Sequence, residues 1–416
     1  MVGSHEPSDR APGIPARNEA WPERPGAKRR EREDMNKGAE GFVPPPYPHD
    51  QLAELKDVAS AAPGGLVDCS VGTPVDPIPE VAVRALVDAV AGATGYPATI
   101  GSVRYREAAA SWIERRFACT VTPDEVVACI GTKELVASLP RALSLRDPSR
   151  DVVLYPAASY PTYAMGAILA GLRPVPVPVD EQWRIDLSRV AADDAERALL
   201  LWLNDPSNPT GVTATPDEIA ASVEWARARG IVVASDECYA EFTYDDAGAP
   251  TDPVTALAAG LDGVLAVHSL SKRSNMAGLR AGFVAGDGEL VTYLGEIRKH
   301  GGLMTPAPVQ AAAAAALADD AHVREQQARY ADRRAVALPA LEARDLVHNG
   351  GPSTFYLWLR TAAGPSDGWA ITADLAKTGL LVAPGDFYGD AGADHVRLAL
   401  TVSDAQLALA CERLTA

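Results

Sequence analysis

Short apolar runs recur between residues 150 and 270, and segments with helical spacing separate them. The runs are VVLYP (152–156), LLLWLND (199–205), IVVASDE (231–237) and GVLAVHSL (263–270). Nearly continuous apolar strands that alternate with helices are typical of a parallel sheet covered by helices on both faces. The pattern therefore predicts an α/β fold built on such a sheet.

One separating segment carries helix signals at both ends. Thr215 and Glu218 have the spacing of a capping box, and Pro216 occupies the first helical position. Gly230 follows the last apolar position and is suited to the backbone that ends a helix. A helix is therefore predicted to open at Thr215 and to end before Gly230.

The pattern changes after an Ala-rich stretch with helical spacing near residues 306–344. Beyond it, further apolar runs alternate with predicted helices near 368–378 and 403–414. These runs are TFYLWLR (354–360), LLVAP (380–384) and HVRLAL (395–400). They predict a second, smaller α/β layer.

Residues 1–40 do not share this regular pattern. They contain five prolines, few large apolar residues and a run of mixed charge at residues 28–34. Such a segment buries too little apolar surface to offset the entropy that ordering would cost. We predict a disordered N-terminal extension, with regular structure beginning near Phe42.

Composition and charge exclude several classes of protein. The 416 residues carry a net charge of -17, which argues against binding to nucleic acid or to an anionic membrane surface. No apolar run reaches the ~18 residues that a membrane span needs. The five cysteines show no CxxC spacing and indicate reduced core thiols, not a metal site. With no secretory h-region, the chain is expected in the cytoplasm, without a metal.

Polar residues directly after the apolar runs are the first candidates for a site, because ligands bind at the carboxyl ends of strands in open α/β sheets. The candidates are Asn208 in NDPSNPTG, Asp236 and Tyr239 in SDECY, Lys272 in SLSK, and Thr132 with Lys133 in CIGTKEL. Each alone has an ordinary explanation as a turn residue, a helix cap or a solvated cation. Together they favour one shared site.

This combination fits the chemistry of pyridoxal phosphate. An aldehyde cofactor needs an amine for a Schiff base, and a lysine partly removed from water is nucleophilic, which Lys272 provides. The pyridine nitrogen needs a carboxylate partner to stay protonated, and Asp236 is placed for it. Tyr239 and Asn208 can donate to the ring oxygen.

The phosphate of such a cofactor needs helix N-terminal amides together with hydroxyl groups and cations. The residues that provide them are Thr132, Lys133, Ser269 and Arg280.

These motifs resemble those of the fold-type I, class I/II pyridoxal-phosphate aminotransferases over nearly all of residues 42–416. NPTG, SDECY, SLSK with a downstream arginine, and Arg397 in HVRLAL occur in the family's order. The resemblance implies a large domain (75–315) with a mostly parallel seven-stranded sheet between helices. It also implies a small α/β domain (316–416) and an N-terminal segment (41–74) that packs with it.

The resemblance also implies roles for individual residues. Lys272 would hold the cofactor and carry protons, and Tyr160 in SYPTY would stack on the cofactor ring. Tyr96 would reach the phosphate of a partner subunit, which implies a homodimer with shared sites. Gly72 and Arg397 would bind the substrate carboxylate. Thr73 departs from the acidic residue that many members carry, which leaves the details of that loop open.

Longer stretches resemble the actinobacterial type of N-succinyldiaminopimelate aminotransferase. They include LVDCSVGTPVDPIP, GTKELVASLP, AVHSLSKRSNMAGLRAGFVAGD and LLVAPGDFYGDAGADHVRLAL. This resemblance implies transfer of an amino group between glutamate and an N-succinylated substrate of lysine and diaminopimelate synthesis. Both substrates carry a second carboxylate, for which the candidate partners are Arg104, Arg273, Arg298 and Lys299.

Other functions remain open at this point. The chain fits an aminotransferase of a specialised pathway with another amino acceptor, or a β-lyase or decarboxylase on the same fold. A regulator that keeps this fold as a ligand sensor would need an additional DNA-binding module of ~70 residues, for which residues 1–40 are too short.

Overall fold

The structure, a computed structural model, describes residues 41–416. The predicted disordered extension, residues 1–40, lies outside the described residues. The chain divides into two units, Met1–Leu52 and Ala53–Ala416. The first unit contains a 3-10 helix, η1 (Pro48–Leu52), and all the elements described below belong to the second.

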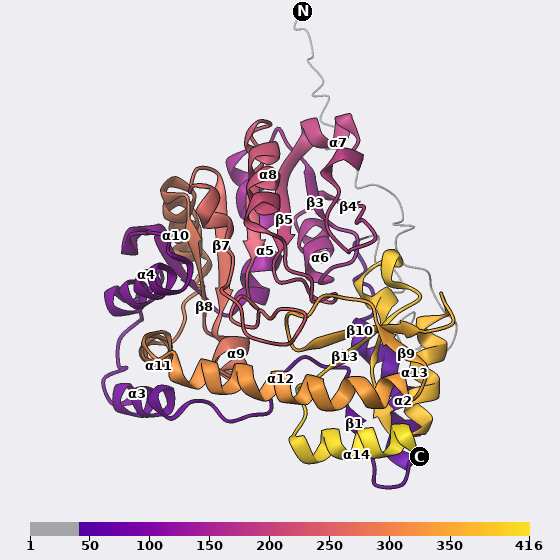
Figure 1. Ribbon diagram of the computed structural model, residues 1–416. Helices are drawn as coiled ribbons and strands as arrows, with labels where there is room; N and C mark the ends of the chain where they lie inside the picture. The colour runs from indigo at the N-terminus through magenta and orange to yellow at the C-terminus, as the bar shows by residue number, and fades with distance from the viewer. Residues whose placement is uncertain (1–40) are drawn as a thin grey trace, which may run out of the picture. The chain divides into compact units, whose positions relative to one another are not determined.

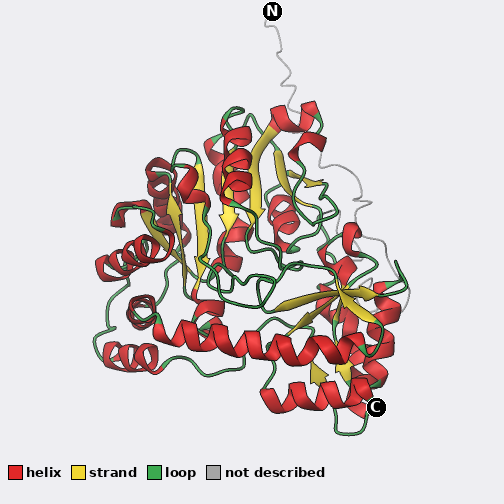
Figure 2. Cartoon of the chain, viewed as in Figure 1, coloured by secondary structure: helices red, strands yellow, loops and turns green. Residues whose placement is uncertain are grey.

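Within the described part of the chain, seven strands form the larger sheet in the order β2-β8-β7-β6-β5-β3-β4 (Figures 1 and 2). Only β8 runs antiparallel to its neighbours, and the other adjacent pairs are parallel. The strands are β2 (Val126–Cys129), β3 (Val152–Pro156), β4 (Arg173–Val177), β5 (Ala198–Asn204), β6 (Val232–Asp236), β7 (Val264–Ser269) and β8 (Gly282–Gly286). The four apolar runs of residues 150–270 are therefore confirmed as strands of one mostly parallel sheet.

Alternate residues of each strand enter two different cores. In β7, Val264 and Ala266 join one core, whereas Leu265 and Val267 join the other. One face is covered by α3 (Glu80–Val90), α4 (Val103–Phe117), α8 (Pro216–Arg227) and α11 (Ala307–Ala318). The opposite face is covered by α5 (Thr132–Arg146), α6 (Thr162–Leu169) and α10 (Gly288–Gly301). Burial on both faces explains why the strands read as continuous apolar runs.

The helix predicted from its capping signals is α8. The Thr215 hydroxyl accepts from the Glu218 amide at 3.3 Å, and the Glu218 carboxylate accepts from the Thr215 amide at 2.8 Å. Gly230 has a φ of 65°, which suits glycine at a helix end. Both ends of α8 therefore follow from local side-chain chemistry.

The smaller layer contains a four-stranded antiparallel sheet in the order β12-β13-β10-β9, counted within residues 41–416. Its strands are β9 (Leu346–His348), β10 (Tyr356–Thr361), β12 (Ala383–Pro384) and β13 (Val396–Ala399). β1 (Val67–Asp68) pairs in parallel with β11 (Leu380–Leu381). The helices of this layer are α2 (Ala53–Ala61), α12 (Ala321–Glu342), α13 (Gly368–Lys377) and α14 (Asp404–Thr415).

Two details of this layer differ from the sequence pattern. The Ala-rich stretch forms two helices, α11 and α12, which Asp319 and Asp320 separate. The Asp319 carboxylate accepts from the Ala321 amide at the start of α12 at 3.0 Å. The run LLVAP is divided between β11 and β12, which pair with different strands. Figure 1 shows α12 as the long helix that runs from α11 toward the small sheet.

Shorter helices complete the fold. They are α7 (Ala192–Arg197), α9 (Leu270–Arg273) and the 3-10 helices η2 (Pro123–Glu125), η3 (Leu187–Arg189), η4 (Ala256–Ala259), η5 (Ala277–Leu279), η6 (Gly385–Tyr388) and η7 (Asp390–Gly392). Among residues 41–416, no helix combines the length and apolar character that a membrane span requires.

One carboxyl buried at the end of β6 has a raised pKa. Glu237 directly follows β6, and its carboxyl accepts from the Ala256 amide at 2.8 Å. Burial raises the pKa of Glu237 to about 8. Burial also lowers the pKa of the neighbouring His268, 3.5 Å away, to about 3. The two side chains are therefore neutral neighbours and do not form an ion pair.

Replacing Glu237 with glutamine is expected to reduce the loss of stability that occurs as pH rises toward about 8. Because the folded-state pKa lies above the unfolded value, the stability from Glu237 is complete at low pH and is lost as pH rises through the folded pKa. The contribution falls by on the order of 1 kcal/mol per pH unit as pH approaches about 8. Urea unfolding of the wild type and Glu237→Gln between about pH 6.5 and 8 measures this. Parallel stability curves for the two proteins would contradict it.

Candidate active site

Lys272 lies on the short helix α9, directly after the carboxyl end of β7. The Ser269 hydroxyl caps this helix by accepting from the Ser271 amide at 3.1 Å. The Lys272 amine donates to the carbonyl of Gly72 and lies 5.8 Å from the centre of the Phe355 ring. The residue as a whole is partly exposed, but burial of its amino group lowers the pKa of Lys272. A buried amine of this kind is more readily deprotonated and more nucleophilic than an exposed one.

Asp236 is the last residue of β6 and lies beside Asn204 at the end of β5. Its carboxylate accepts from the Tyr163 hydroxyl at 2.9 Å and from the Cys238 amide at 3.3 Å. Burial raises the pKa of Asp236, and these hydrogen bonds oppose that effect. The Asn204 side chain links the two strand ends by donating to the Asp236 carbonyl at 2.9 Å and accepting from the Asn208 amide at 2.8 Å. Asn204 therefore positions both predicted residues.

Arg397 projects from β13 of the small sheet toward the loop after β5. Its guanidinium donates to the Asn208 side-chain oxygen at 2.9 Å and to the Ser70 carbonyl at 2.8 Å. It also lies 4.0 Å and 4.8 Å from the ring centres of Tyr356 and Tyr388. Among the described residues, its Nε has no hydrogen-bond partner although it is buried. Arg397 therefore retains a donor for another group.

Tyr239 joins the same region from the turn after β6. Its hydroxyl lies 2.9 Å from the hydroxyl of Tyr356, and burial raises the pKa of Tyr239 well above its ordinary value. Gly72 fits against Tyr356 only because it lacks a side chain: a Cβ there would lie 2.0 Å from the Tyr356 hydroxyl oxygen. Tyr356 is thus a contact point for three segments of the site.

The N-terminus of α5 provides a cluster of anion-binding groups. Gly131 precedes the helix with a φ of 70°, and a Cβ there would lie 2.3 Å from the nearest nitrogen of Arg280. Thr132 opens the helix with its hydroxyl 3.2 Å from the Cys238 sulfur, and Lys133 follows at an exposed position. The helix amides and the adjacent guanidinium together favour a phosphate-like anion.

The remaining predicted aromatic residues have different positions. Tyr160 packs against Tyr163 with ring centres 5.8 Å apart, so it lies one contact away from Asp236. Tyr96 is 96% exposed, so it is not packed among the buried residues of this site.

The candidates for a distal carboxylate are corrected by the structure. They are Arg104, Arg273, Arg298 and Lys299. Arg298 is buried and binds both carboxylate oxygens of Glu134 at 2.9 and 2.8 Å. Arg273 is buried in an ion pair with Glu241. Arg104 is exposed, and the Lys299 amine is paired with Glu296 at 2.6 Å. Internal pairing therefore removes Arg273 and Arg298 from the candidates for direct substrate contact.

The sequence motifs did not identify several residues of the site. Tyr163 lies three positions after Tyr160, on the next turn of the same segment, which was a usable signal. Cys238 stands between Asp236 and Tyr239 in SDECY. Tyr356 had no sequence signal, because its role depends on contacts with Gly72 and Arg397 far away in the chain.

Comparisons with known proteins agree with this geometry. The family model for aminotransferase class I and II matches residues 65–414. A probable aminotransferase of Mycobacterium tuberculosis, Rv1178, is 47% identical over 89% of this chain and 85% of its own length. The 4-dedimethylamino-4-oxo-anhydrotetracycline transaminase OxyQ of Streptomyces rimosus is 44% identical over 89% of this chain and 99% of its own. In structure, a probable N-succinyldiaminopimelate aminotransferase from Thermus thermophilus matches with a TM-score of 0.80 and 30% identity, covering 89% of this chain and 99% of that one.

Proposed function

Because the chain belongs to the class I and II aminotransferases, we propose that it transfers an amino group between glutamate and an N-succinylated 2-amino-6-oxopimelate-type substrate. The family fold, the aminotransferase activity and the cofactor, pyridoxal phosphate, follow from the match over residues 65–414. The residue roles, the substrate and the assembly below are our proposal. The observation that carries it is a set of contacts around Lys272. Its amine donates to the carbonyl of Gly72, Gly72 fits against Tyr356, and Tyr356 contacts the Arg397 guanidinium. The charge of Lys272 also lowers the pKa of the buried Asp236 carboxyl, against the larger effect of burial.

The residues present fit the cofactor. Asp236 is a buried carboxylate whose side-chain hydrogen bonds come from neutral donors, so a protonated pyridine nitrogen would supply the missing charge. Tyr239 and Asn208 would hold the ring oxygen, and Tyr160 would stack on the ring. The phosphate would bind at the start of α5 with the groups of Thr132, Lys133, Ser269 and Arg280.

The proposed mechanism uses the chain's own groups to bind substrate and move a proton. When bound, pyridoxal phosphate stabilises negative charge that develops at the substrate α-carbon. Lys272 would take the α-proton on its Nζ and return it, a role that its lowered pKa favours at neutral pH. Asp236 would hold positive charge at the pyridine nitrogen.

Arg397 would bind the substrate α-carboxylate together with the amide of Gly72. A guanidinium presents two parallel donors that match a carboxylate, and the Nε of Arg397 has no partner within residues 41–416. Stacking on Tyr356 fixes the plane of that fork before substrate arrives.

Arg397→Lys is expected to raise KM for glutamate and for the N-succinylated substrate by at least about 30-fold, or ~2 kcal/mol, because an ammonium cannot reproduce the planar fork. Steady-state kinetics measure both KM values, and the visible absorbance of bound cofactor serves as the control because it should not change. If both KM values stayed within about twofold of wild type, Arg397 would not be the carboxylate clamp.

A second candidate substrate has a specific observation in its favour. The 44% identity to OxyQ extends over 99% of that protein, which favours an aminotransferase of a specialised pathway with another amino acceptor. A ping-pong assay with glutamate and a panel of ketoacids separates the two. The proposal expects the N-succinylated ketoacid to give the highest kcat/KM. Preference for a cyclic or polyketide ketone supports the alternative, and release of ammonia or carbon dioxide indicates a lyase or decarboxylase.

We further propose a cytoplasmic homodimer in which Tyr96 of each subunit completes the neighbouring site. The side chain of Tyr96 is 96% exposed, and α3 presents the exposed valines Val83, Val87 and Val90 nearby in sequence. Mixing inactive Lys272→Ala with inactive Tyr96→Ala subunits should restore part of the activity, because one site of each mixed dimer carries both residues. No recovery despite subunit exchange would contradict the shared site.

A further inference from the structure

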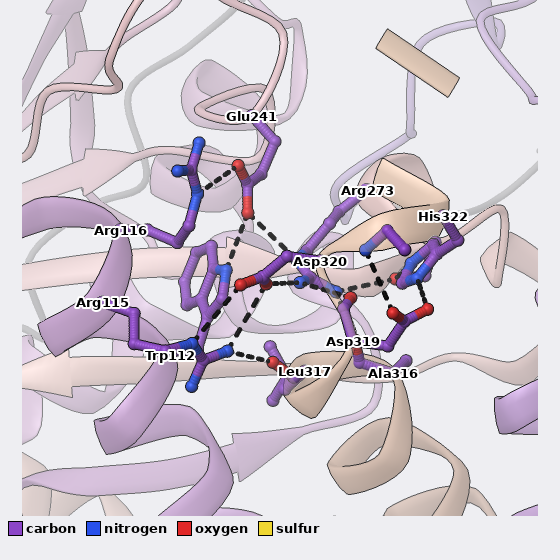
Figure 3. Close-up of polar contacts among 12 residues, drawn as sticks. Trp112, Arg115, Arg116, Glu241, Arg273, Ala316, Leu317, Asp319, Asp320 and His322 are labelled. Carbon is purple, nitrogen blue, oxygen red and sulfur yellow. Dashed lines mark hydrogen bonds and ion pairs between the residues drawn. The ribbon is translucent and has the colours of Figure 1, made fainter. Parts of the chain in front are cut away.

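A buried polar network surrounds the residue that follows Lys272. We call it the Arg273–Glu241 network (Figure 3). Its members come from α4, the turn after β6, α9 and the junction of α11 with α12. They are Trp112, Arg115, Arg116, Glu241, Arg273, Ser274, Ala316, Asp319, Asp320 and His322.

Arg273 is the centre of this network. Its guanidinium donates to the Glu241 carboxylate at 3.2 Å and to the Ala316 carbonyl at 2.7 Å. It also donates to the Asp319 carbonyl at 3.3 Å and to the Asp320 carboxylate at 3.2 Å. The Ala316 carbonyl lies in the last turn of α11 and also accepts from the Asp319 amide at 3.3 Å, so this guanidinium adds a second donor at the end of α11.

Glu241 is held as firmly as its partner. Its carboxylate accepts from the Trp112 indole at 2.7 Å and from the Arg116 guanidinium at 2.9 Å, in addition to Arg273. The side chains of Glu241 and Arg273 are each 3% exposed. Burying such an ion pair costs desolvation free energy. Removing one of the two partners leaves the charge of the other buried and uncompensated.

A second branch joins Arg273 to the start of α12. Arg273 donates to the Ser274 hydroxyl at 3.1 Å, and that hydroxyl lies 2.9 Å from His322 Nε2. His322 Nδ1 lies 2.7 Å from the Asp319 carboxylate. Burial lowers the pKa of His322, which fits a neutral ring that accepts from Ser274 and donates to Asp319.

The network fixes the short helix that carries Lys272. Helix α9 contains only four residues, Leu270–Arg273, and a helix that short has no stability of its own. Neighbouring residues on a helix point about 100° apart, so a fixed Arg273 sets the direction of Lys272. Glu241 is five residues after Asp236 and two after Tyr239, in the same turn region. The Arg273–Glu241 pair therefore joins the lysine segment to the carboxylate and tyrosine segment.

We propose that Arg273 and Glu241 are positioning residues that hold the Lys272 amine at its working distance from Asp236 and Tyr239. This inference rests on the proposed role of Lys272 in holding the cofactor. Neither residue points at substrate: both act through the segments to which they are attached.

The test measures capture of pyridoxal phosphate by full-length enzyme stripped of cofactor. Arg273→Met is expected to slow covalent capture of the cofactor by at least about tenfold, because a small misplacement of a reacting group lowers the reaction rate strongly. Visible absorbance measures the rate of capture. Arg273→Lys and Glu241→Gln should each slow it by at least about threefold, since each keeps part of the network. In all three, kcat should fall more than KM rises, because Arg397 is undisturbed.

Arg106→Met is the matched control. Arg106 is also a buried arginine of the large domain, and it binds the carbonyls of Gly101 and Pro123 and the carboxylate of Asp124. Arg106→Met should lower the unfolding temperature of the stripped enzyme about as much as Arg273→Met does, and it should leave the capture rate within about twofold of wild type.

The outcomes separate the inference from the proposed function. Capture by Arg273→Met at the wild-type rate, with a loss of stability like that of Arg106→Met, would show a purely structural pair and overturn the inference. If Arg273→Met does not fold, the capture rates and stabilities of Arg273→Lys and Glu241→Gln are compared with those of Arg106→Met in the same way. Failure of the wild type itself to capture cofactor would instead reject the proposed role of Lys272.

Discussion

Lys272→Ala is expected to lower kcat by at least roughly 10⁴-fold, because the substitution removes both the covalent attachment of the cofactor and the group that moves the α-proton. Since alanine has a high helix propensity and, within residues 41–416, the Lys272 amine makes one hydrogen bond, to the Gly72 carbonyl, the fold should persist. Single-turnover assays with glutamate measure the chemical step directly, and circular dichroism with thermal unfolding checks the fold.

Lys299→Ala provides the control for loss of a lysine. Lys299 lies near the end of α10, and its amine is paired with Glu296 on the protein surface. The Lys299→Ala variant should keep kcat within about twofold of wild type, because an exposed ion pair contributes little. Turnover by Lys272→Ala at a rate comparable to wild type would remove Lys272 from the mechanism.

Asp236→Asn is expected to lower kcat by about 10² to 10³-fold. The amide keeps the size of the carboxylate but removes its charge, so the pyridine nitrogen would lose the partner that keeps it protonated. Asp236→Ala should be at least as damaging, because it also removes the hydrogen bonds with Tyr163 and Cys238. Stopped-flow measurement of each half-reaction reports the loss separately from substrate binding.

Glu237→Gln is the matched control for this substitution. Glu237 is the next residue in the chain and is equally a buried carboxyl, but it accepts from the Ala256 amide and neighbours His268. Its replacement should leave kcat within a few-fold of wild type while changing the dependence of stability on pH. Equal losses in the two variants would indicate that general disruption of this strand end, not the charge of Asp236, reduces activity.

The large sheet could be predicted because burial on both faces makes its strands continuous apolar runs. Strand β3 begins and ends where the run VVLYP does, and the ends of the other three differ from their runs by one residue on each side. The candidate residues at the strand ends followed from the same pattern, since parallel strands present their carboxyl ends at one edge. The structure brings Asn208 and Arg397 into contact from opposite halves of the chain.

Other features depend on pairing that no local pattern contains. Arg273 stands beside Lys272 in the sequence and was a candidate for substrate contact, but the helix turns it toward Glu241 in the core. Arg298 similarly ends in a pair with Glu134. Tyr356 becomes part of the site only when the small sheet packs beside Gly72. In each case the partner is more than 30 residues away in sequence, and only the fold reveals it.

Both proposed substrates carry a second carboxylate besides the one that Arg397 would bind. With Arg273 and Arg298 paired internally, the second carboxylate of glutamate or of an N-succinylated substrate would meet other groups than these two arginines. The relatives carry different named activities, among them the tetracycline-type transaminase OxyQ and a probable N-succinyldiaminopimelate aminotransferase. The ketoacid panel is therefore the experiment that decides between them.

The central claim is that Lys272 holds the cofactor. Borohydride reduction of the cofactor-loaded enzyme, followed by proteolysis and peptide mass spectrometry, locates the attachment point. We expect the added cofactor mass on the peptide that contains SLSKRSNM, at Lys272, in the wild type and in Arg397→Lys. Mass on another lysine such as Lys133, or no fixed cofactor in enzyme that catalyses transamination, would contradict the account.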